Sequence, residues 1–201
     1  MLLPFIFVSL FSIITCDPVT ESTEKNGTFY YFAYGSNLLA KRIHIKNPSA
    51  VFYSPAKLQN YRLDFVTYDE PWGGTAATIV EDNEEFVWGA LWTLDVNQMR
   101  YLDEQEDVAS NMYIPKNVVV STPNGTEISA RTYQETAVPT KIKRGEDLPF
   151  DRRPSSTYLG VITLGAIESQ LPAEYIAYLF SIPANGHMAS EIKRKELGYP
   201  F

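Results

Sequence analysis

Short runs of β-branched and aromatic residues, separated by glycines and prolines, fill much of this chain. Such runs are typical of β-strands, whose apolar side chains alternate with polar ones or cover both faces of a buried sheet. Asn124-Gly125 separates the last two runs and predicts a tight hairpin turn. So many strands in a small protein favour a closed or strongly curled sheet. The predicted strands cover residues 28–34, 50–54, 59–68, 74–80, 85–94, 114–122 and 126–135.

Three other segments carry apolar residues at helical spacing. Residues 95–106 begin at Asp95, which suits a helix N-cap, and residues 173–182 follow a proline that suits helix entry. The third segment covers residues 156–169. The chain is therefore predicted to be an α+β protein, with a small curled mixed β-sheet or barrel flanked by helices.

The composition suits one globular domain, because 45% of the 201 residues are hydrophobic and 20% are charged. We predict that this domain covers residues 28–184, after a signal peptide (1–16) and a flexible segment (17–27). Residues 138–154 are rich in proline and charge and predict a surface loop that could serve as a lid. The polar residues 185–201 predict a loosely packed C-terminal tail.

The N-terminal residues 2–15 contain no charge and are mostly apolar. This run of 14 residues is shorter than the roughly 20 that cross a bilayer, so it predicts a secretory signal cleaved after Cys16. An apolar first strand and a retained membrane anchor are the alternatives. Asn-x-Thr motifs at Asn26 and Asn124 suit glycosylation on a secretory route. Together these features predict a secreted or luminal glycoprotein.

The charge and the rare residue types exclude several kinds of chemistry. A formal net charge of −7 argues against nucleic acid or an anionic membrane as partner, because an acidic surface repels both. Cys16 is the single cysteine, so no intramolecular disulfide can form, and removal of the signal would leave no thiol. His44 and His187 are the only histidines, which argues against a histidine metal site. Carboxylates remain as the catalytic groups.

Residues 30–38 form an aromatic strand that runs into a small polar turn. Gly35 lets the backbone approach a ligand closely, and Ser36 and Asn37 bend at little cost. A turn of this kind can point several backbone N–H groups at one spot, which suits a carboxylate or phosphate. The segment therefore predicts an anion cradle, although most such turns carry no ligand.

The acidic run 102–107 contains a carboxylate on the apolar side of its predicted helix. At roughly 100° per residue, Glu106 falls about 20° from Met99, whereas Glu104 points about 140° away. Burial disfavours the ionised form, so the pKa of Glu106 should be raised toward neutrality, as a general acid or base requires. Asp103 lies about 40° from the stripe and remains a second candidate. A buried carboxyl tied to a tyrosine or a backbone N–H is the structural alternative for Glu106.

These segments closely resemble the gamma-glutamylcyclotransferase family of animals over about residues 28–180. The resemblance rests on Tyr31-Phe32-Ala33-Tyr34-Gly35-Ser36-Asn37-Leu38-Leu39, Arg42-Ile43-His44, Asn47-Pro48-Ser49-Ala50, Gly73-Gly74-Thr75-Ala76-Ala77-Thr78-Ile79, Val87-Trp88-Gly89, Leu102-Asp103-Glu104-Gln105-Glu106, Met112-Tyr113, Tyr158 and Leu164-Gly165-Ala166.

The resemblance implies a role for individual residues. Glu106 matches the residue that transfers protons, and the backbone amides from Tyr31 to Ser36 would hold the γ-glutamyl group. Asn37 would support this loop, while Tyr158 matches a substrate contact and Tyr113 an aromatic residue near the site. The implied substrate-binding residues are Tyr31, Phe32, Ala33, Tyr34, Gly35, Ser36, Asn37, Tyr113 and Tyr158.

The implied reaction converts γ-glutamyl amino acids to 5-oxo-L-proline and a free amino acid, without a metal or organic cofactor. The resemblance also implies a homodimer. Two features depart from the family: its members are usually cytosolic, and Asp107 stands where they usually have glycine. A secreted, non-catalytic protein that binds γ-glutamyl or other carboxylate compounds is the alternative function.

Overall fold

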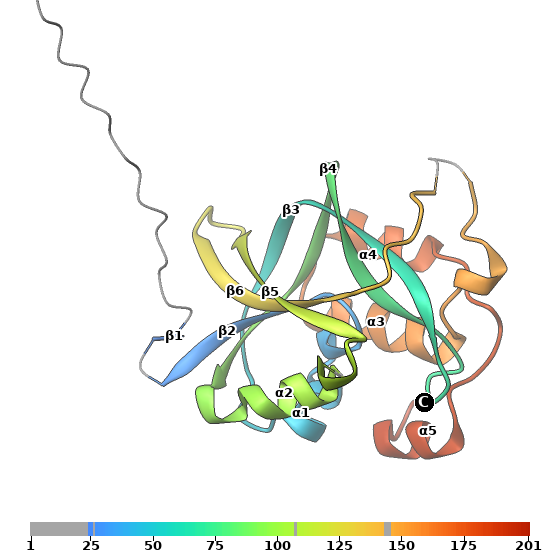
Figure 1. The fold of residues 1–201 in the computed structure, drawn as a ribbon, viewed down its shortest axis with the longest axis horizontal. Coiled ribbons are helices and arrows are strands. Elements are labelled where there is room, and N and C mark those ends of the chain that lie inside the picture. The colour runs from blue at the N-terminus through green and yellow to red at the C-terminus, as the bar shows by residue number, and fades with distance from the viewer. Residues whose placement is uncertain (1–23, 26, 107, 143–145) are drawn as a thin grey trace, which may run out of the picture.

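The computed structural model describes residues 24–25, 27–106, 108–142 and 146–201 (Figure 1). The predictions of a signal peptide over residues 1–16 and of a glycosylated Asn26 concern residues outside these ranges, as does Asp107. Among the residues described, no helix is long and apolar enough to cross a membrane.

Five strands form a closed, barrel-like ring, as the strand-rich sequence predicted. The sheet order is β1-β2-β4-β3-β5-β6, and a parallel contact between Tyr31 and Arg131 joins β2 to β6 and closes the ring, with β1 outside it. All other strand pairs are antiparallel, so the sheet is mixed. The strands are β1 (Glu24–Lys25), β2 (Thr28–Ala33), β3 (Val51–Asp69), β4 (Gly74–Asp95), β5 (Tyr113–Ser121) and β6 (Glu127–Glu135).

The two longest strands each join two runs that we predicted as separate strands. β3 continues through Pro55, which lies opposite Ala90 of β4, and passes a bulge at Asn60, whose φ angle is 63°. Bulges let a strand bend sharply while its ladder continues beyond them. Closing the ring requires such bends, so the proline and the polar residues that marked breaks in the sequence lie inside continuous strands.

In the described part of the chain five α-helices accompany the ring, and the three predicted helices are among them. α2 (Met99–Gln105) follows a short turn capped by Asp95, whose side chain accepts a hydrogen bond from the N–H of Asn97. α3 (Ser156–Glu168) and α4 (Ala173–Ser181) pack together beside the sheet (Figure 1). α1 (Ala40–Lys46) was not predicted; it has seven residues and lies beside α2.

The C-terminal segment is more ordered than the predicted loose tail. α5 (Glu191–Leu197) begins with Ser190, whose side chain accepts a hydrogen bond from the N–H of Lys193. Leu197 and Ala189 bury their side chains in the core. Phe201 also packs against the core, and the Ser190 N–H donates to the Pro71 carbonyl at 3.0 Å, so both apolar and backbone contacts hold the segment.

The 138–154 loop is anchored to the ring. Arg152 forms an ion pair with Asp64 and donates hydrogen bonds to the carbonyls of Phe65 and Thr140. Arg62 donates to the carbonyl of Pro139. These contacts join the described part of the loop to β3, as a fixed connection on the surface.

Strand β2 delivers the predicted cradle to the centre of the molecule. Its last three residues are all buried, because the ring covers one face of the strand and the helices cover the other. A strand covered on both faces has a continuous apolar sequence rather than an alternating one. The turn after Ala33 therefore starts from rigid, fully packed backbone.

Candidate active site

The turn after β2 forms one wall of a pocket. A short helical turn, Ser36–Leu38, follows Gly35, and the N–H of Leu38 donates to the Gly35 carbonyl at 3.0 Å. Helix starts leave their first N–H groups without an intrahelical acceptor. Among the described residues, the backbone N–H groups of Ser36 and Asn37 have no such acceptor. This agrees with the expected arrangement of open backbone donors.

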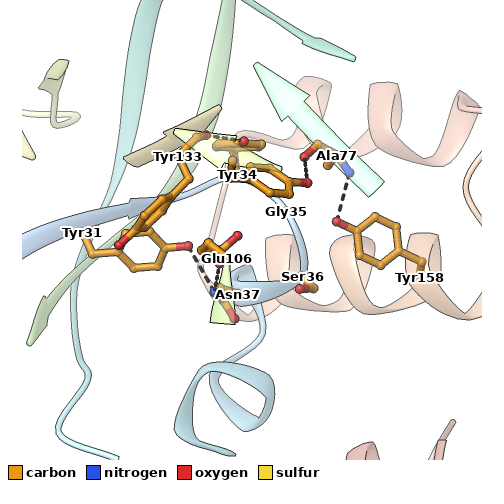
Figure 2. A pocket seen from close by; sticks show the side chains of 10 residues that line it. Tyr31, Tyr34, Gly35, Ser36, Asn37, Ala77, Glu106, Tyr133 and Tyr158 are labelled. Carbon is orange, nitrogen blue, oxygen red and sulfur yellow. Dashed lines mark hydrogen bonds between the residues drawn. The ribbon is translucent and has the colours of Figure 1, made fainter. Parts of the chain in front are cut away.

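The pocket lies between this turn, the ring and the helices α2 and α3 (Figure 2). Its empty volume, including the opening to solvent, is about 310 Å³. Part of this volume is open solvent, so the enclosed part has room only for a compact ligand. The pocket is lined by Tyr31, Tyr34, Gly35, Ser36, Asn37, Ala77, Glu106, Tyr113, Tyr133 and Tyr158.

Glu106 brings a carboxyl group into this pocket from the end of α2. Its backbone N–H donates to the Leu102 carbonyl at 3.0 Å, which continues the helical pattern by one residue. Its Oε1 accepts hydrogen bonds from Asn37 Nδ2 at 3.1 Å and from Gln105 Nε2 at 3.4 Å. Its Oε2 accepts none from the described residues. One carboxyl oxygen is therefore held in place while the other stays open to a ligand.

The environment of Glu106 favours the neutral carboxyl. Burial is the largest cause and raises its pKa to about 7, with Asp103 adding to the rise. Arg42 and the hydrogen bond from Gln105 act in the opposite direction. Although Glu106 keeps a partly accessible surface, it lines the pocket rather than the outer face. A pKa near neutrality lets one group both accept and donate a proton.

The other carboxylates of the acidic run lie elsewhere. Asp103 accepts hydrogen bonds from Arg131 at 2.7 Å and from the Tyr133 hydroxyl at 2.5 Å, and it does not line the pocket. Glu104 is exposed. Glu106 is thus the member of this run that reaches the site, as the helical spacing indicated.

Two predicted tyrosines meet at Ala77 on the opposite wall. The Ala77 N–H donates to the Tyr158 hydroxyl oxygen at 3.1 Å (Figure 2). The Tyr113 hydroxyl donates to the Ala77 carbonyl at 2.9 Å. Trp72 packs edge-on against Tyr158 with ring centroids 4.8 Å apart. Burial raises the pKa of both tyrosines, so both hydroxyls stay protonated. The Tyr158 proton has no acceptor among the described residues and is available to a ligand.

Not every predicted binding residue lines the pocket. Phe32 and Ala33 are buried in the core behind it, where the Phe32 carbonyl accepts a hydrogen bond from Thr132 at 2.9 Å. Tyr133 and Ala77 line the pocket and were not predicted. The sequence around Tyr133 does not single it out as a pocket residue. The last four residues of β6 are all buried, so burial is not particular to this tyrosine. Only ring closure brings that strand beside β2.

The described residues contain no group of three or more His, Cys, Asp and Glu side chains that could hold a metal ion. The polar groups of the pocket are one carboxyl, one side-chain amide, several hydroxyls and backbone N–H groups.

Comparisons with known proteins give a consistent relationship. The AIG2-like family model matches residues 86–179. Gamma-glutamylcyclotransferase of Bos taurus is 46% identical over 178 residues, covering 85% of this chain and 89% of the relative, and that of Homo sapiens is 40% identical over 185 residues, covering 89% and 92%. A solved gamma-glutamyl cyclotransferase is 38% identical, with a TM-score of 0.75 over 85% of this chain and 98% of that one.

These comparisons correct the predicted localisation. Residues 1–16, on which secretion rested, lie outside the described residues, and no signal peptide is shown. Gamma-glutamylcyclotransferases are generally cytosolic enzymes. The prediction of a secreted or luminal protein was wrong, because an uncharged apolar run alone does not specify export.

The relatives match almost the whole length of the domain, including the strand, turn and helix that form the pocket. Similarity of this extent in both sequence and fold establishes common descent and the general enzymatic activity. The chain belongs to the gamma-glutamylcyclotransferase family of enzymes.

Proposed function

We propose that the protein converts γ-glutamyl amino acids to 5-oxo-L-proline and the free amino acid, with Glu106 as the proton-transfer residue. One observation carries this proposal. The Glu106 carboxyl has one oxygen held by Asn37 and Gln105 and the other open to the pocket. Its pKa of about 7 suits proton transfer in both directions near neutral pH.

The polar groups of the pocket match the ends of a γ-glutamyl group. Its α-carboxylate needs donors, which the N–H groups of Ser36 and Asn37 and the Tyr158 hydroxyl can supply. Its α-ammonium needs an acceptor, which is the open oxygen of Glu106. Tyr31, Tyr34, Gly35 and Tyr113 form the walls. In this arrangement, Phe32 and Ala33 support the turn from behind.

The reaction is an intramolecular aminolysis. Ionised Glu106 takes a proton from the α-ammonium, and the neutral amine attacks the γ-carbonyl to form a five-membered ring. The protonated carboxyl then gives its proton to the leaving nitrogen as the carbon–nitrogen bond breaks. The ring nitrogen passes its surplus proton through Glu106 to the released amine, so no proton is gained or lost overall. Holding the chain folded for closure supplies a proximity effect.

The enzyme is further proposed to consist of one catalytic domain and to form a homodimer. Residues 28–184 form the catalytic domain and residues 185–201 are its C-terminal extension. The family resemblance supports a homodimer, which sedimentation at several protein concentrations would detect.

The decisive assay measures 5-oxoproline released from γ-glutamyl-alanine, with glutathione as a second substrate. Wild-type protein should turn over γ-glutamyl-alanine, and Glu106→Gln should lose at least about 100-fold in kcat, in the range that a general acid–base group supplies. Glu104→Gln is the matched control, because Glu104 is exposed on the same helix. It should retain the wild-type rate.

Ligand binding separates the two functions considered for this fold. Glu106→Gln should still bind γ-glutamyl-alanine in calorimetry, since the remaining donors of the pocket are intact. A wild-type protein that binds the dipeptide and releases no 5-oxoproline would instead be a non-catalytic binding protein. Equal turnover by wild type and Glu106→Gln would remove Glu106 from the mechanism.

A further inference from the structure

A second carboxyl group lies directly behind the pocket wall. Glu135 is the last residue of β6, and only 1% of its surface is exposed. Its Oε1 lies 3.1 Å from the Tyr113 hydroxyl oxygen, while its buried Oε2 accepts no hydrogen bond of good geometry from the described residues, although Thr67 on β3 lies close to the carboxyl. Glu135 itself does not line the pocket, but Tyr113 does. The proposed reaction leaves this carboxyl without a role.

The hydrogen bonds around Tyr113 depend on whether Glu135 carries a proton. The Tyr113 hydroxyl lies 2.9 Å from the Ala77 carbonyl and 3.1 Å from Glu135 Oε1, yet it has one proton to donate. A carbonyl can only accept. Both contacts are therefore fully satisfied when Glu135 is neutral, so that it donates to Tyr113 while Tyr113 donates to Ala77. An ionised Glu135 competes with Ala77 for the Tyr113 proton.

This choice reaches the substrate side of the wall through Ala77. The carbonyl of this residue binds Tyr113, and its N–H donates to Tyr158 at 3.1 Å. Tyr113 lines the pocket, and so does Tyr158 (Figure 2). The proton on Glu135 thus determines whether Ala77 is held from both sides, and with it the position of the Tyr158 hydroxyl.

The groups around Glu135 shift the pKa of its carboxyl toward neutral pH. Burial is the largest cause and raises its pKa to about 7, and Asp69 on β3 adds to the rise. Thr67 on β3 and Tyr113 on β5 favour the ionised form. The Thr78 hydroxyl on β4 accepts a hydrogen bond from the Glu135 backbone N–H rather than binding its carboxyl. The fields of Tyr34 and of Tyr158 on α3 also reach Glu135, and these hydroxyls are neutral.

We propose that Glu135 is a positioning residue of the active site, whose neutral carboxyl keeps Tyr113 on Ala77 and whose ionised form disturbs the Ala77–Tyr158 wall. This inference rests on the proposed γ-glutamyl activity. Glu135 is then a titrating group of the substrate-binding wall, separate from Glu106. Because its ionised form disturbs this wall, substrate binding weakens as the pH rises.

KM should rise with pH, because only the neutral form of Glu135 supports substrate binding. At pH 8 the neutral fraction of a group with a pKa of about 7 is roughly a tenth, so the apparent KM should rise about tenfold between pH 6 and pH 8. Glu135→Gln cannot ionise and can donate to Tyr113, so its ratio of KM values at the two pH values should fall to about one. Glu106 is unchanged in this variant, so the pH dependence of kcat should persist.

The experiment measures KM and kcat for γ-glutamyl-alanine across this pH range in wild type, Glu135→Gln, Tyr113→Phe and the double variant. Tyr113→Phe removes the hydroxyl through which Glu135 acts, so adding Glu135→Gln to it should leave the KM profile unchanged. Glu127→Gln, an exposed glutamate at the other end of β6, is the matched control and should keep the wild-type profile. If Glu135→Gln does not fold, Glu135→Met also removes the competing charge and should flatten the profile.

The proposal is overturned if wild type and Glu135→Gln show the same dependence of KM on pH, or if Glu135→Gln still alters that dependence in the Tyr113→Phe background. Failure of the general function looks different, because wild type would then release no 5-oxoproline at any pH. In that case calorimetric titration with γ-glutamyl-alanine at pH 6 and pH 8 replaces KM. The same comparison of variants then decides the role of Glu135.

Discussion

The Asn37 side-chain amide lies 3.1 Å from Glu106 Oε1 and connects the turn after β2 to the end of α2. Its Nδ2 also donates to the Tyr31 hydroxyl at 3.1 Å, and its Oδ1 accepts from Gln105 Nε2 at 3.0 Å. These three contacts determine which way the amide points. Asn37 therefore fixes one oxygen of Glu106 by a donor that favours the ionised carboxylate.

Asn37→Ala should move the acid limb of the pH–rate profile toward higher pH. In wild type, Glu106 is neutral below a pKa of about 7 and cannot accept the substrate proton, so kcat should rise as the pH increases through about 7. Removing the donor should raise that pKa further and shift the limb by about one pH unit. Steady-state rates between pH 5 and pH 9 test this.

The exposed Asn117→Ala on β5 serves as the control and should leave the limb in place. An unshifted limb in Asn37→Ala would contradict the role assigned to this amide.

Gly35→Ala should impair substrate binding more than stability. A Cβ atom at this position would lie 3.2 Å from the Tyr158 hydroxyl oxygen and 3.5 Å from the Ala77 Cβ, so it would narrow the pocket between its two walls. We expect KM to rise about tenfold or more, whereas the free energy of unfolding should change by only about 1 kcal/mol. Initial rates and urea unfolding measure the two quantities.

Gly160→Ala, inside α3, offers a matched comparison, because its Cβ would make only an ordinary 3.6 Å contact with Phe201. It should stabilise the helix by about 0.5–1 kcal/mol and leave KM unchanged. A similar KM for Gly35→Ala and wild type would show that the ligand does not pass between Gly35 and Tyr158.

Glu135→Gln should make the free energy of unfolding depend less on pH between pH 5 and pH 8. The pKa of Glu135 is raised from 4.5 to about 7 by folding, so its stabilising effect is complete below about 4.5 and is lost as the pH rises through 7. The variant should therefore gain stability over wild type between pH 5 and pH 8, by up to about 3 kcal/mol. Urea unfolding at both pH values tests this.

The exposed Glu127→Gln should show no such gain. A constant difference between Glu135→Gln and wild type at pH 5 and pH 8 would mean that folding does not raise the pKa of Glu135.

Local sequence determined the elements that carry the chemistry. Alternating and aromatic runs predicted the strands, Asp95 predicted the start of the α2 segment, and helical spacing selected Glu106 over Glu104, because these features depend on near neighbours along the chain. The turn at Gly35, Ser36 and Asn37 was predicted for the same reason.

Tertiary structure decided which of these elements meet. Tyr133 reaches the pocket because β2 pairs with β6 and closes the ring, and Ala77 reaches it on β4. These contacts join residues far apart in the chain, and no local pattern encodes them. Glu135 lies opposite Tyr113 in the β5–β6 hairpin, and only the packing of the ring around this pair buries the carboxyl behind the pocket wall. Helical spacing placed Glu106 on the apolar side of its helix and so predicted its raised pKa. The raised pKa of Glu135 comes instead from burial by distant segments, which is a property of packing and not of sequence spacing.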